Sequence, residues 1–177
     1  NTSQSFHLHT EKEDRIFNGK YESDYLNKIA FPIGGIGAGM FCLEGTGAVS
    51  HLSVENHPDV FNEPYAFAAL HIKGLKNASK ELEAQIPKWK LFGSPGSGLG
   101  MGEKSYGFPR FKKGTFLTRF PFAYIDLEDK DIPLHTKITG WSPFIPTDED
   151  NSSLPLGVLE YSFQNPTKET IEAVFSF

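Results

Sequence analysis

The stretch FLTRFPFAYIDL, Phe116–Leu127, carries the strand signal on which the fold prediction depends. It is rich in aromatic residues, and a strand over this range would place Phe120, Phe122 and Tyr124 on one face. In the stretch that follows, Leu134–Trp141, successive residues alternate in the same way between the two faces that a strand would have. This period of two residues, in place of the 3.6-residue period of a helix, predicts β-structure.

Further strand signals lie on both sides of this stretch. Met40–Val54 has the pattern of a hairpin, because two apolar runs flank the turn-forming residues Glu44–Gly47. Ser79–Ile86 fits either a strand or a short helical turn ended by Pro87. Two more strand candidates are Tyr65–Lys73 and the stretch in which Leu159, Tyr161 and Phe163 share one face. Short strands between Pro, Gly and Asn turns, without a convincing amphipathic helix, predict an all-β fold, an antiparallel β-sandwich.

The alternating pattern continues to the last residue of the chain. Four apolar residues would share one face of the final strand: Ile171, Ala173, Phe175 and Phe177. Such a face needs a covering surface, and no turn or polar tail follows it. We therefore expect an incomplete N-terminal part of a larger sandwich domain, with a polar arm at residues 1–28 and the truncated sandwich at residues 29–177.

Composition excludes several classes of function. A chain of 177 residues with 38% hydrophobic residues can bury one core. The net charge is −5 and no cluster of Lys and Arg stands out, which argues against a nucleic-acid partner. No apolar run approaches the roughly 20 residues of a membrane span, so no transmembrane segment is expected. The single cysteine, Cys42, excludes an internal disulfide, and its alternating apolar surroundings favour a buried, inert thiol over a nucleophile.

The stretch FPIGGIGAGM, Phe31–Met40, raises the question of a nucleotide site. Its four glycines are Gly34, Gly35, Gly37 and Gly39. Met40 stands where the dinucleotide fingerprint needs its third glycine, and a hairpin follows in place of the helix that would hold a pyrophosphate. The glycines are therefore interpreted as packing residues, which let the backbone lie against a neighbouring surface or adopt a positive φ.

Polar residues after this hairpin do not form a recognisable catalytic or metal motif. His51, Glu55 and His57 lack the helical H-E-x-x-H arrangement, so polar side chains lining a loop are favoured over a metal site. Glu55, Asp59 and Glu63 are close in sequence, but their spacing does not indicate a converging pair of carboxylates. No metal ion and no cofactor is predicted.

Several stretches together resemble one family. They are IAFPIGGIGAGMFCLEGTGAVSHLSVEN (Ile29–Asn56), IPKWKLFG (Ile86–Gly93), YGFPRF (Tyr106–Phe111) and the long run Phe116–Thr167. In order and spacing they resemble the N-terminal domain of glycoside hydrolase family 116, which includes bacterial β-glucosidases and the animal non-lysosomal glucosylceramidase. Any one of these stretches alone is a weak signal, whereas the series is specific.

The resemblance implies a two-domain enzyme, an N-terminal β-sandwich followed by a catalytic (α/α)6-barrel. Such enzymes cleave β-linked glucosides or xylosides with retention, using a glutamate nucleophile and an aspartate acid/base that both belong to the barrel. No position in residues 1–177 matches these carboxylates, so no catalytic residue is assigned. The 177-residue chain is expected to be inactive alone, to support the barrel and its substrate pocket, and to meet a β-linked glucoside or related glycan only through the full-length enzyme.

The residues expected on the substrate side or at the barrel interface come from two stretches, ENHPDVFNEP and WSPFIP. They are Glu55, Asn56, His57, Asn62 and Trp141. The Gly/Pro/Ser-rich loop Phe92–Phe111 is a third candidate for this surface. Trp89 and Trp141 could stack on a sugar ring, although a buried core or interface aromatic is the favoured interpretation.

Two alternatives of other classes remain open. One is a free-standing carbohydrate-binding β-sandwich module, and the other is a structural or interaction module that exposes an apolar patch. The first residue is Asn1 and not Met, which fits either a removed signal peptide or a fragment. The compartment is left open, with an exported bacterial enzyme, periplasmic or extracellular, favoured over a cytoplasmic one.

Overall fold

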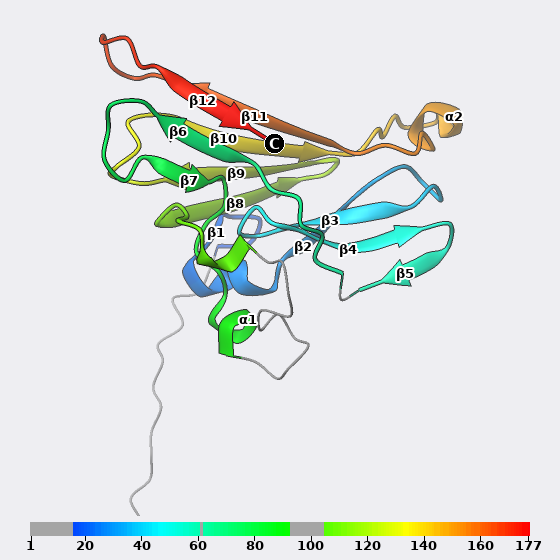
Figure 1. Cartoon of the computed structure of the whole chain (residues 1–177). Coiled ribbons are helices and arrows are strands. Elements are labelled where there is room, and N and C mark those ends of the chain that lie inside the picture. Colours follow the sequence, from blue (N-terminus) through cyan, green and yellow to red (C-terminus); the bar gives the residue numbers. More distant parts are fainter. Residues whose placement is uncertain (1–15, 61, 93–104) are drawn as a thin grey trace, which may run out of the picture.

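The chain folds as an all-β protein with antiparallel sheets, in a computed structural model that describes residues 16–60, 62–92 and 105–177 (Figure 1). The largest sheet has five strands in the order β1 (Tyr21–Glu22), β8 (Lys113–Arg119), β9 (Phe122–Glu128), β10 (His135–Trp141) and β11 (Val158–Gln164). A second sheet has the order β12 (Ala173–Ser176), β6 (Ala69–Ile72) and β7 (Ser79–Glu81). The third has the order β2 (Ala30–Ile33), β3 (Met40–Glu44), β4 (Val49–Val54) and β5 (His57–Asp59).

Helices are short and lie in the connections. They are η1 (Ser23–Lys28), α1 (Lys88–Phe92), η2 (Ser105–Gly107) and α2 (Glu149–Ser152). Asp148 caps α2, because its side chain accepts a hydrogen bond from the Asn151 amide. None of the helices in the described part of the chain is long or apolar enough to span a membrane.

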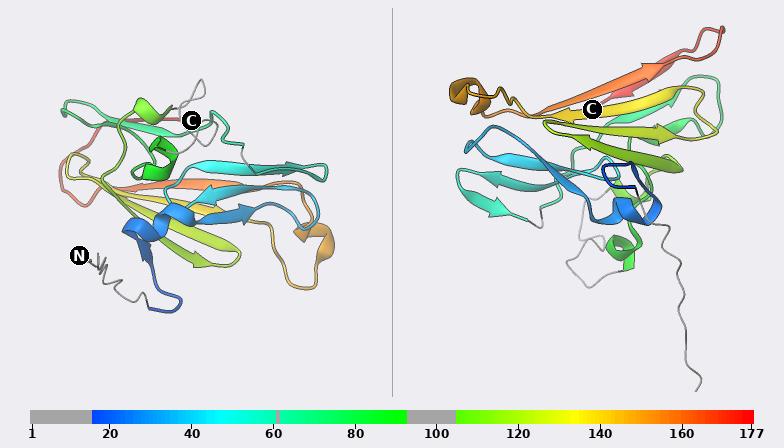
Figure 2. Two further views of the ribbon diagram at one scale, coloured as in Figure 1. Left: turned by 90° about the horizontal axis from the view of Figure 1, so that it is seen from below. Right: turned by 180° about the vertical axis from the view of Figure 1, so that it is seen from behind.

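The sheets form two packed layers, as the sandwich prediction required. In the left view of Figure 2 the four-stranded sheet lies over the five-stranded one, and β6, with which β12 pairs, lies on the same side as the four-stranded sheet. The rings of Phe31 in β2 and Phe116 in β8 are 6.3 Å apart, and those of Tyr161 in β11 and Phe175 in β12 are 5.4 Å apart. One hydrophobic core draws buried residues from all three sheets: Ile33, Leu43, Leu70, Ile72, Phe116, Ile125 and Ile138. Burying a side chain such as Phe116 contributes about 1.5–3 kcal/mol to stability.

The prediction of one strand over Phe116–Leu127 is wrong, because this stretch is a hairpin. β8 ends at Arg119 and β9 begins at Phe122, and the two pair antiparallel. Pro121 stands between them, where its missing N–H removes nothing from the ladder. Phe120 therefore does not share a strand with Phe122, whereas Phe122 and Tyr124 do share a face, with stacked rings 6.1 Å apart.

Other predicted elements are confirmed. Met40–Val54 is a hairpin, in which the Gly47 amide donates to the Glu44 carbonyl oxygen across the turn. Leu134–Trp141 contains β10, whose inward residues are buried while alternate ones face outward. The ambiguous stretch Ser79–Ile86 begins as a strand, because Ser79–Glu81 pairs with β6 and no helical turn forms there.

The N-terminal segment joins the folded body earlier than the sequence indicated. Residues 1–15 of the predicted arm lie outside the described residues. Tyr21–Glu22 pairs with β8, and the Tyr21 ring meets that of Phe116 at 6.2 Å. Leu26 in η1 is buried in the core, because it is the apolar residue of an otherwise polar turn. Residues 21–28, assigned to the arm from their polarity, are thus part of the folded body in the structure.

Candidate functional site

Three of the stretches singled out in the sequence lie at one end of the structure, at the right of Figure 1. We call this the loop end, and it consists of the β2–β3 loop (residues 34–39), the β4–β5 turn (residues 55–56) and the β10–β11 connection (residues 142–157). The Ile36 amide donates a hydrogen bond to the Ser152 carbonyl oxygen at 2.9 Å. The Gly34 amide donates to the Ser142 hydroxyl oxygen at 3.1 Å. The glycine loop is thereby attached to the β10–β11 connection.

Close backbone contacts explain the glycines of this loop. A Cβ atom on Gly34 would collide with the Gly39 carbonyl oxygen, and one on Gly35 would collide with the Leu154 carbonyl oxygen. A Cβ on Gly39 would lie 2.5 Å from the Ser53 carbonyl oxygen. Gly37 differs, because it has open space around it but a φ of +69°. The loop therefore needs close approach at Gly34, Gly35 and Gly39, and a positive φ both at Gly37 and at Gly39, where φ is +98°.

Replacing Gly37 by valine is expected to lower the free energy of unfolding by about 1–3 kcal/mol, because a β-branched residue is strained at positive φ. Gly37→Asn serves as the control, since asparagine tolerates this conformation, and should cost less than about 1 kcal/mol. Urea unfolding monitored by circular dichroism measures both variants. Equal stability of the valine and asparagine variants would argue against a required left-handed turn at this position.

The predicted residues Glu55, Asn56 and His57 form and follow the β4–β5 turn. Glu55 and Asn56 have φ values of +49° and +62°, which is the pattern of a tight hairpin turn of the primed type. The His57 ring nitrogen Nδ1 lies 2.7 Å from the Glu55 carbonyl oxygen, to which it donates when protonated. All three side chains are exposed. Asn62 lies nearby in the chain, where its carbonyl oxygen accepts from the His51 amide and its side chain donates to Asp59.

Trp141 is not brought together with these residues. It ends β10 next to Gly140, whose inward position points Trp141 to the outer face of the five-stranded sheet. There its ring lies 6.3 Å from that of Phe122. The turn residues belong to the four-stranded sheet of the other layer. The five predicted residues thus occupy two places and do not form one pocket.

A buried group of charged residues, not predicted from the sequence, lies beside β3 and α1. Lys90 is buried, and its ammonium nitrogen lies 2.7 and 2.8 Å from the two carboxylate oxygens of Glu44. It also lies 2.6 Å from a carboxylate oxygen of Glu63. The Tyr106 hydroxyl donates a hydrogen bond to the other Glu63 oxygen. The ammonium group thus joins the β3 carboxylate to the segment that precedes β6.

A second ion network lies beside it, around Arg110. The guanidinium group binds the carboxylate of Glu81, and its Nε donates to a Glu83 oxygen at 3.0 Å. Another guanidinium nitrogen donates to the Phe108 carbonyl oxygen at 3.1 Å. Arg110 and both glutamates are buried. The network holds β7 to the chain that leads into β8, where Glu81 and Arg110 also form a parallel bridge.

The surroundings of these groups fit a structural role. Burial raises the pKa of Glu83 above its ordinary value, although Arg110 opposes this effect. For Lys90, burial would lower the pKa, but the carboxylates of Glu44 and Glu63 outweigh burial and raise it. Lys90 therefore stays charged at neutral pH. Each carboxylate of the two networks faces a cation, an arrangement that holds segments together.

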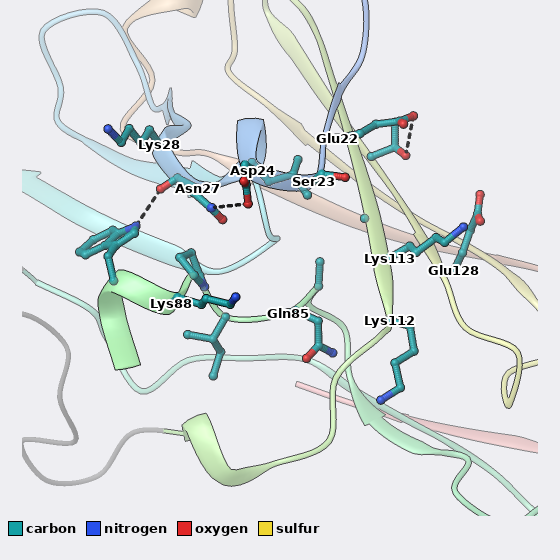
Figure 3. A pocket seen from close by; sticks show the side chains of 17 residues that line it. Glu22, Ser23, Asp24, Asn27, Lys28, Gln85, Lys88, Lys112, Lys113 and Glu128 are labelled. Atoms are coloured by element: carbon teal, nitrogen blue, oxygen red, sulfur yellow. Dashed lines mark hydrogen bonds between the residues drawn. The ribbon is translucent and has the colours of Figure 1, made fainter. Parts of the chain in front are cut away.

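A wide polar hollow opens between η1, residues 84–89 and the start of β8 (Figure 3). Its volume is about 880 Å³, and we call it the Trp89 hollow. Its lining includes Asp24, Asn27, Gln85, Lys88 and Trp89. Its walls come from three separate segments, so the sequence named Trp89 as a possible sugar contact without indicating the hollow. Most of the loop Phe92–Phe111, also a candidate, lies outside the described residues.

Over the described ranges, no group of three or more His, Cys, Asp and Glu side chains could hold a metal ion. Cys42 is a buried free thiol, and burial raises its pKa, with a further contribution from Glu44. Burial and the raised pKa both fit the buried, inert thiol that the sequence favoured.

Comparison with models of protein families identifies a match over most of the chain. A family model described as "beta-glucosidase 2, glycosyl-hydrolase family 116 N-term" matches residues 30–177. No curated protein matches the chain. The family match covers all three sheets except β1, and hence both the loop end and the two ion networks.

Proposed function

The chain belongs to the N-terminal family of glycosyl-hydrolase family 116, and from this membership we propose that it is the non-catalytic β-sandwich portion of a retaining β-glycosidase. The enzyme would act on a β-linked glucoside, glucosylceramide-like substrates included. Its catalytic (α/α)6-barrel would follow the sandwich. The match over residues 30–177, on an all-β fold, is the observation that carries this proposal.

The loop end is the surface proposed to face the barrel. Exposed apolar side chains gather in its three segments and at their borders: Ile36, Val54, Ile145, Leu154 and Leu156. Glu55 and Asn56 form the β4–β5 turn of this surface, His57 begins β5 directly after it, and Asn62 bonds to Asp59 at the end of β5. Apolar side chains next to polar, hydrogen-bonding ones are typical of an interface between domains. Trp141 lies on the outer face of the other layer and is left out of this surface.

An open apolar groove supports the proposal that the sandwich continues with further strands. The groove has a volume of about 490 Å³, and among its walls are Phe41, Leu52, Leu159, Tyr161, Phe175 and Phe177. In the described residues β12 is an edge strand, and Phe177 is 75% exposed. β12 carries no Lys or Pro of the kind that protects a free edge. A further strand of the same enzyme would cover this groove and pair with that edge.

The purified 177-residue chain is expected not to hydrolyse an aryl β-glucoside, because the catalytic pair of carboxylates would belong to the barrel and not to this chain. A chromogenic assay at high protein concentration measures this. The same polypeptide with its barrel is the positive control. Turnover by the isolated chain, retained after further purification, would overturn the proposal.

A charged residue introduced into the loop end is expected to lower the activity or the stability of the full enzyme, in which the barrel is present. Ile36→Asp and Val54→Asp should lower the activity or melting temperature of the full enzyme, since each would bury a carboxylate at the interface. Leu75→Asp is the matched control, because Leu75 is a comparably exposed apolar residue in the β6–β7 turn, outside the loop end. If all three variants behave alike, the loop end does not face the barrel.

A further inference from the structure

The Trp89 hollow has an aromatic wall with a fixed orientation. The indole Nε1 donates a hydrogen bond to the Asn27 carbonyl oxygen at 3.0 Å, which holds the ring against η1. The residue is nevertheless 48% exposed, so a large part of its surface faces solvent. An indole that is held in place while exposed offers a ligand an apolar surface without losing side-chain freedom on binding.

Hydrogen-bonding groups line the hollow on two sides (Figure 3). Asp24 and Asn27 lie along η1, where the Asn27 amide donates to the Asp24 carboxylate at 3.4 Å. Gln85 and Lys88 lie on the opposite side, below them in Figure 3. The Gln85 amide nitrogen donates to the Phe111 carbonyl oxygen at 2.9 Å, which fixes the direction of its side chain. Donors and acceptors thus line both sides of one cavity.

The charges of the hollow are mixed and nearly cancel. Its lysines are Lys28, Lys88, Lys112 and Lys113, and its carboxylates are Glu22, Asp24 and Glu128. A site for phosphate would gather cations around one point, with arginine forks or backbone amides. Mixed donors and acceptors instead suit hydroxyl groups, which both donate and accept hydrogen bonds. The apolar residues Leu26, Ala84, Ile86 and Pro87 suit the C–H faces of a sugar ring.

We propose that the Trp89 hollow binds a neutral glycan, with Trp89 stacking on a sugar ring and Asp24, Gln85 and Lys88 binding its hydroxyl groups. Its volume of about 880 Å³ lies within the range of about 300–1,000 Å³ that is usual for small-molecule sites. The site belongs wholly to this chain. It rests on the proposed function only in the choice of β-glucosides as the first ligands to test.

The two tryptophans of the chain, Trp89 and Trp141, allow a direct test. The Trp141→Phe variant keeps Trp89 as the only indole, and the Trp89→Phe variant keeps Trp141. Titration with cellobiose should change the fluorescence of the Trp141→Phe variant saturably at millimolar concentrations. The Trp89→Phe variant should show no change, because Trp141 lies on the outer face of the five-stranded sheet. Circular dichroism confirms that both variants are folded.

A second pair of variants tests the opposite side of the hollow. In the Trp141→Phe background, Gln85→Ala combined with Lys88→Ala should raise the Kd for cellobiose about tenfold, the effect of losing two hydrogen bonds. Lys130→Ala removes an exposed lysine outside the hollow and should leave the Kd unchanged.

Three results would overturn the inference. They are no saturable change with cellobiose or methyl β-D-glucoside, a change reported by Trp141 alone, or a response to inorganic phosphate in place of the sugars. Since binding is read from fluorescence and not from hydrolysis, this inference can fail while the assay of the isolated chain still supports the proposed function. Conversely, hydrolysis by the isolated chain would overturn the proposed function and leave the binding inference standing.

Discussion

Replacing Arg110 by methionine is expected to lower the free energy of unfolding by about 3–5 kcal/mol, enough to unfold a marginal domain. Arg110 is 5% exposed, and the variant leaves the carboxylates of Glu81 and Glu83 buried without their cation. Methionine has a similar reach and keeps the apolar packing of the side-chain stem. The expected loss therefore comes from the two buried charges and not from a cavity.

Urea unfolding at pH 7 measures this loss, and an exposed ion pair provides the control. Lys73 and Glu172 form a salt bridge with side chains that are 51% and 70% exposed. Lys73→Met should change the unfolding free energy by no more than about 1 kcal/mol. Arg110→Lys should fall between the two, since it keeps the charge but loses the planar fork that reaches both glutamates. A loss below about 1 kcal/mol for Arg110→Met would show that the network contributes little.

The strands that the sequence predicted well are those whose alternation is set by one buried face. In β10, Ile138 is buried and Lys137 is exposed, so the period of two is visible in the residue types themselves. The hairpin at Pro121 was missed because aromatic residues continue through the turn, without the Gly or Asn that usually marks a reversal. A pattern of polarity shows which residues share a face but not where the chain turns back.

The glycine loop was predicted in kind but not in detail. Glycine density indicated close backbone approach, and Gly34, Gly35 and Gly39 show it. The partner of Gly35 is the Leu154 carbonyl oxygen, far along the chain, and no local rule connects the two.

The position of Trp141, in contrast, could have been predicted from the alternation of its own strand. Its place in β10 directly after the inward-facing Gly140 puts it on the outer face, away from the turn at Glu55.

The ion networks were not predicted from the sequence, for a different reason. The run Lys80, Glu81, Leu82, Glu83 looks like an exposed strand, because charged residues are almost never fully buried without partners. Their partners come from segments that only the tertiary fold brings close. β7 has three residues and, within residues 16–60, 62–92 and 105–177, pairs with β6 and forms a bridge to Arg110. Buried ion pairs therefore hold this strand where the ladder of hydrogen bonds is short.

β7 also forms a buried ion pair with Asp129, through Lys80. Replacing Asp129 by asparagine is expected to lower the free energy of unfolding by about 3–5 kcal/mol at pH 7. The Lys80 ammonium lies 3.0 Å from the Asp129 carboxylate, and the two side chains are 5% and 0% exposed. This pair joins the three-stranded sheet to the end of β9 in the five-stranded sheet. One carboxylate oxygen accepts from the Asp131 amide, and the other accepts from the Lys112 amide. An asparagine offers one acceptor, so its NH₂ group would face a donor on one side.

Asp129 also makes the free energy of unfolding depend on pH in the acidic range. Burial would raise the pKa of Asp129, but hydrogen bonds from the Asp131 amide and from Lys80 outweigh it and lower the pKa below its ordinary value. The folded protein thus holds this proton less tightly than the unfolded chain. The contribution of Asp129 is present above the unfolded pKa of about 3.9 and is lost as the pH falls through the folded pKa. Unfolding free energies measured from pH 7 down to pH 3 should fall less steeply for Asp129→Asn than for the wild type.

A double-mutant cycle separates the ion pair from the amide hydrogen bonds. Lys80→Met removes the buried ammonium but leaves Asp129 its two backbone donors, so it should cost less than Asp129→Asn. The double variant should cost less than the sum of the two, since no buried cation is then left unpaired. Strict additivity would mean that Lys80 and Asp129 do not interact in solution.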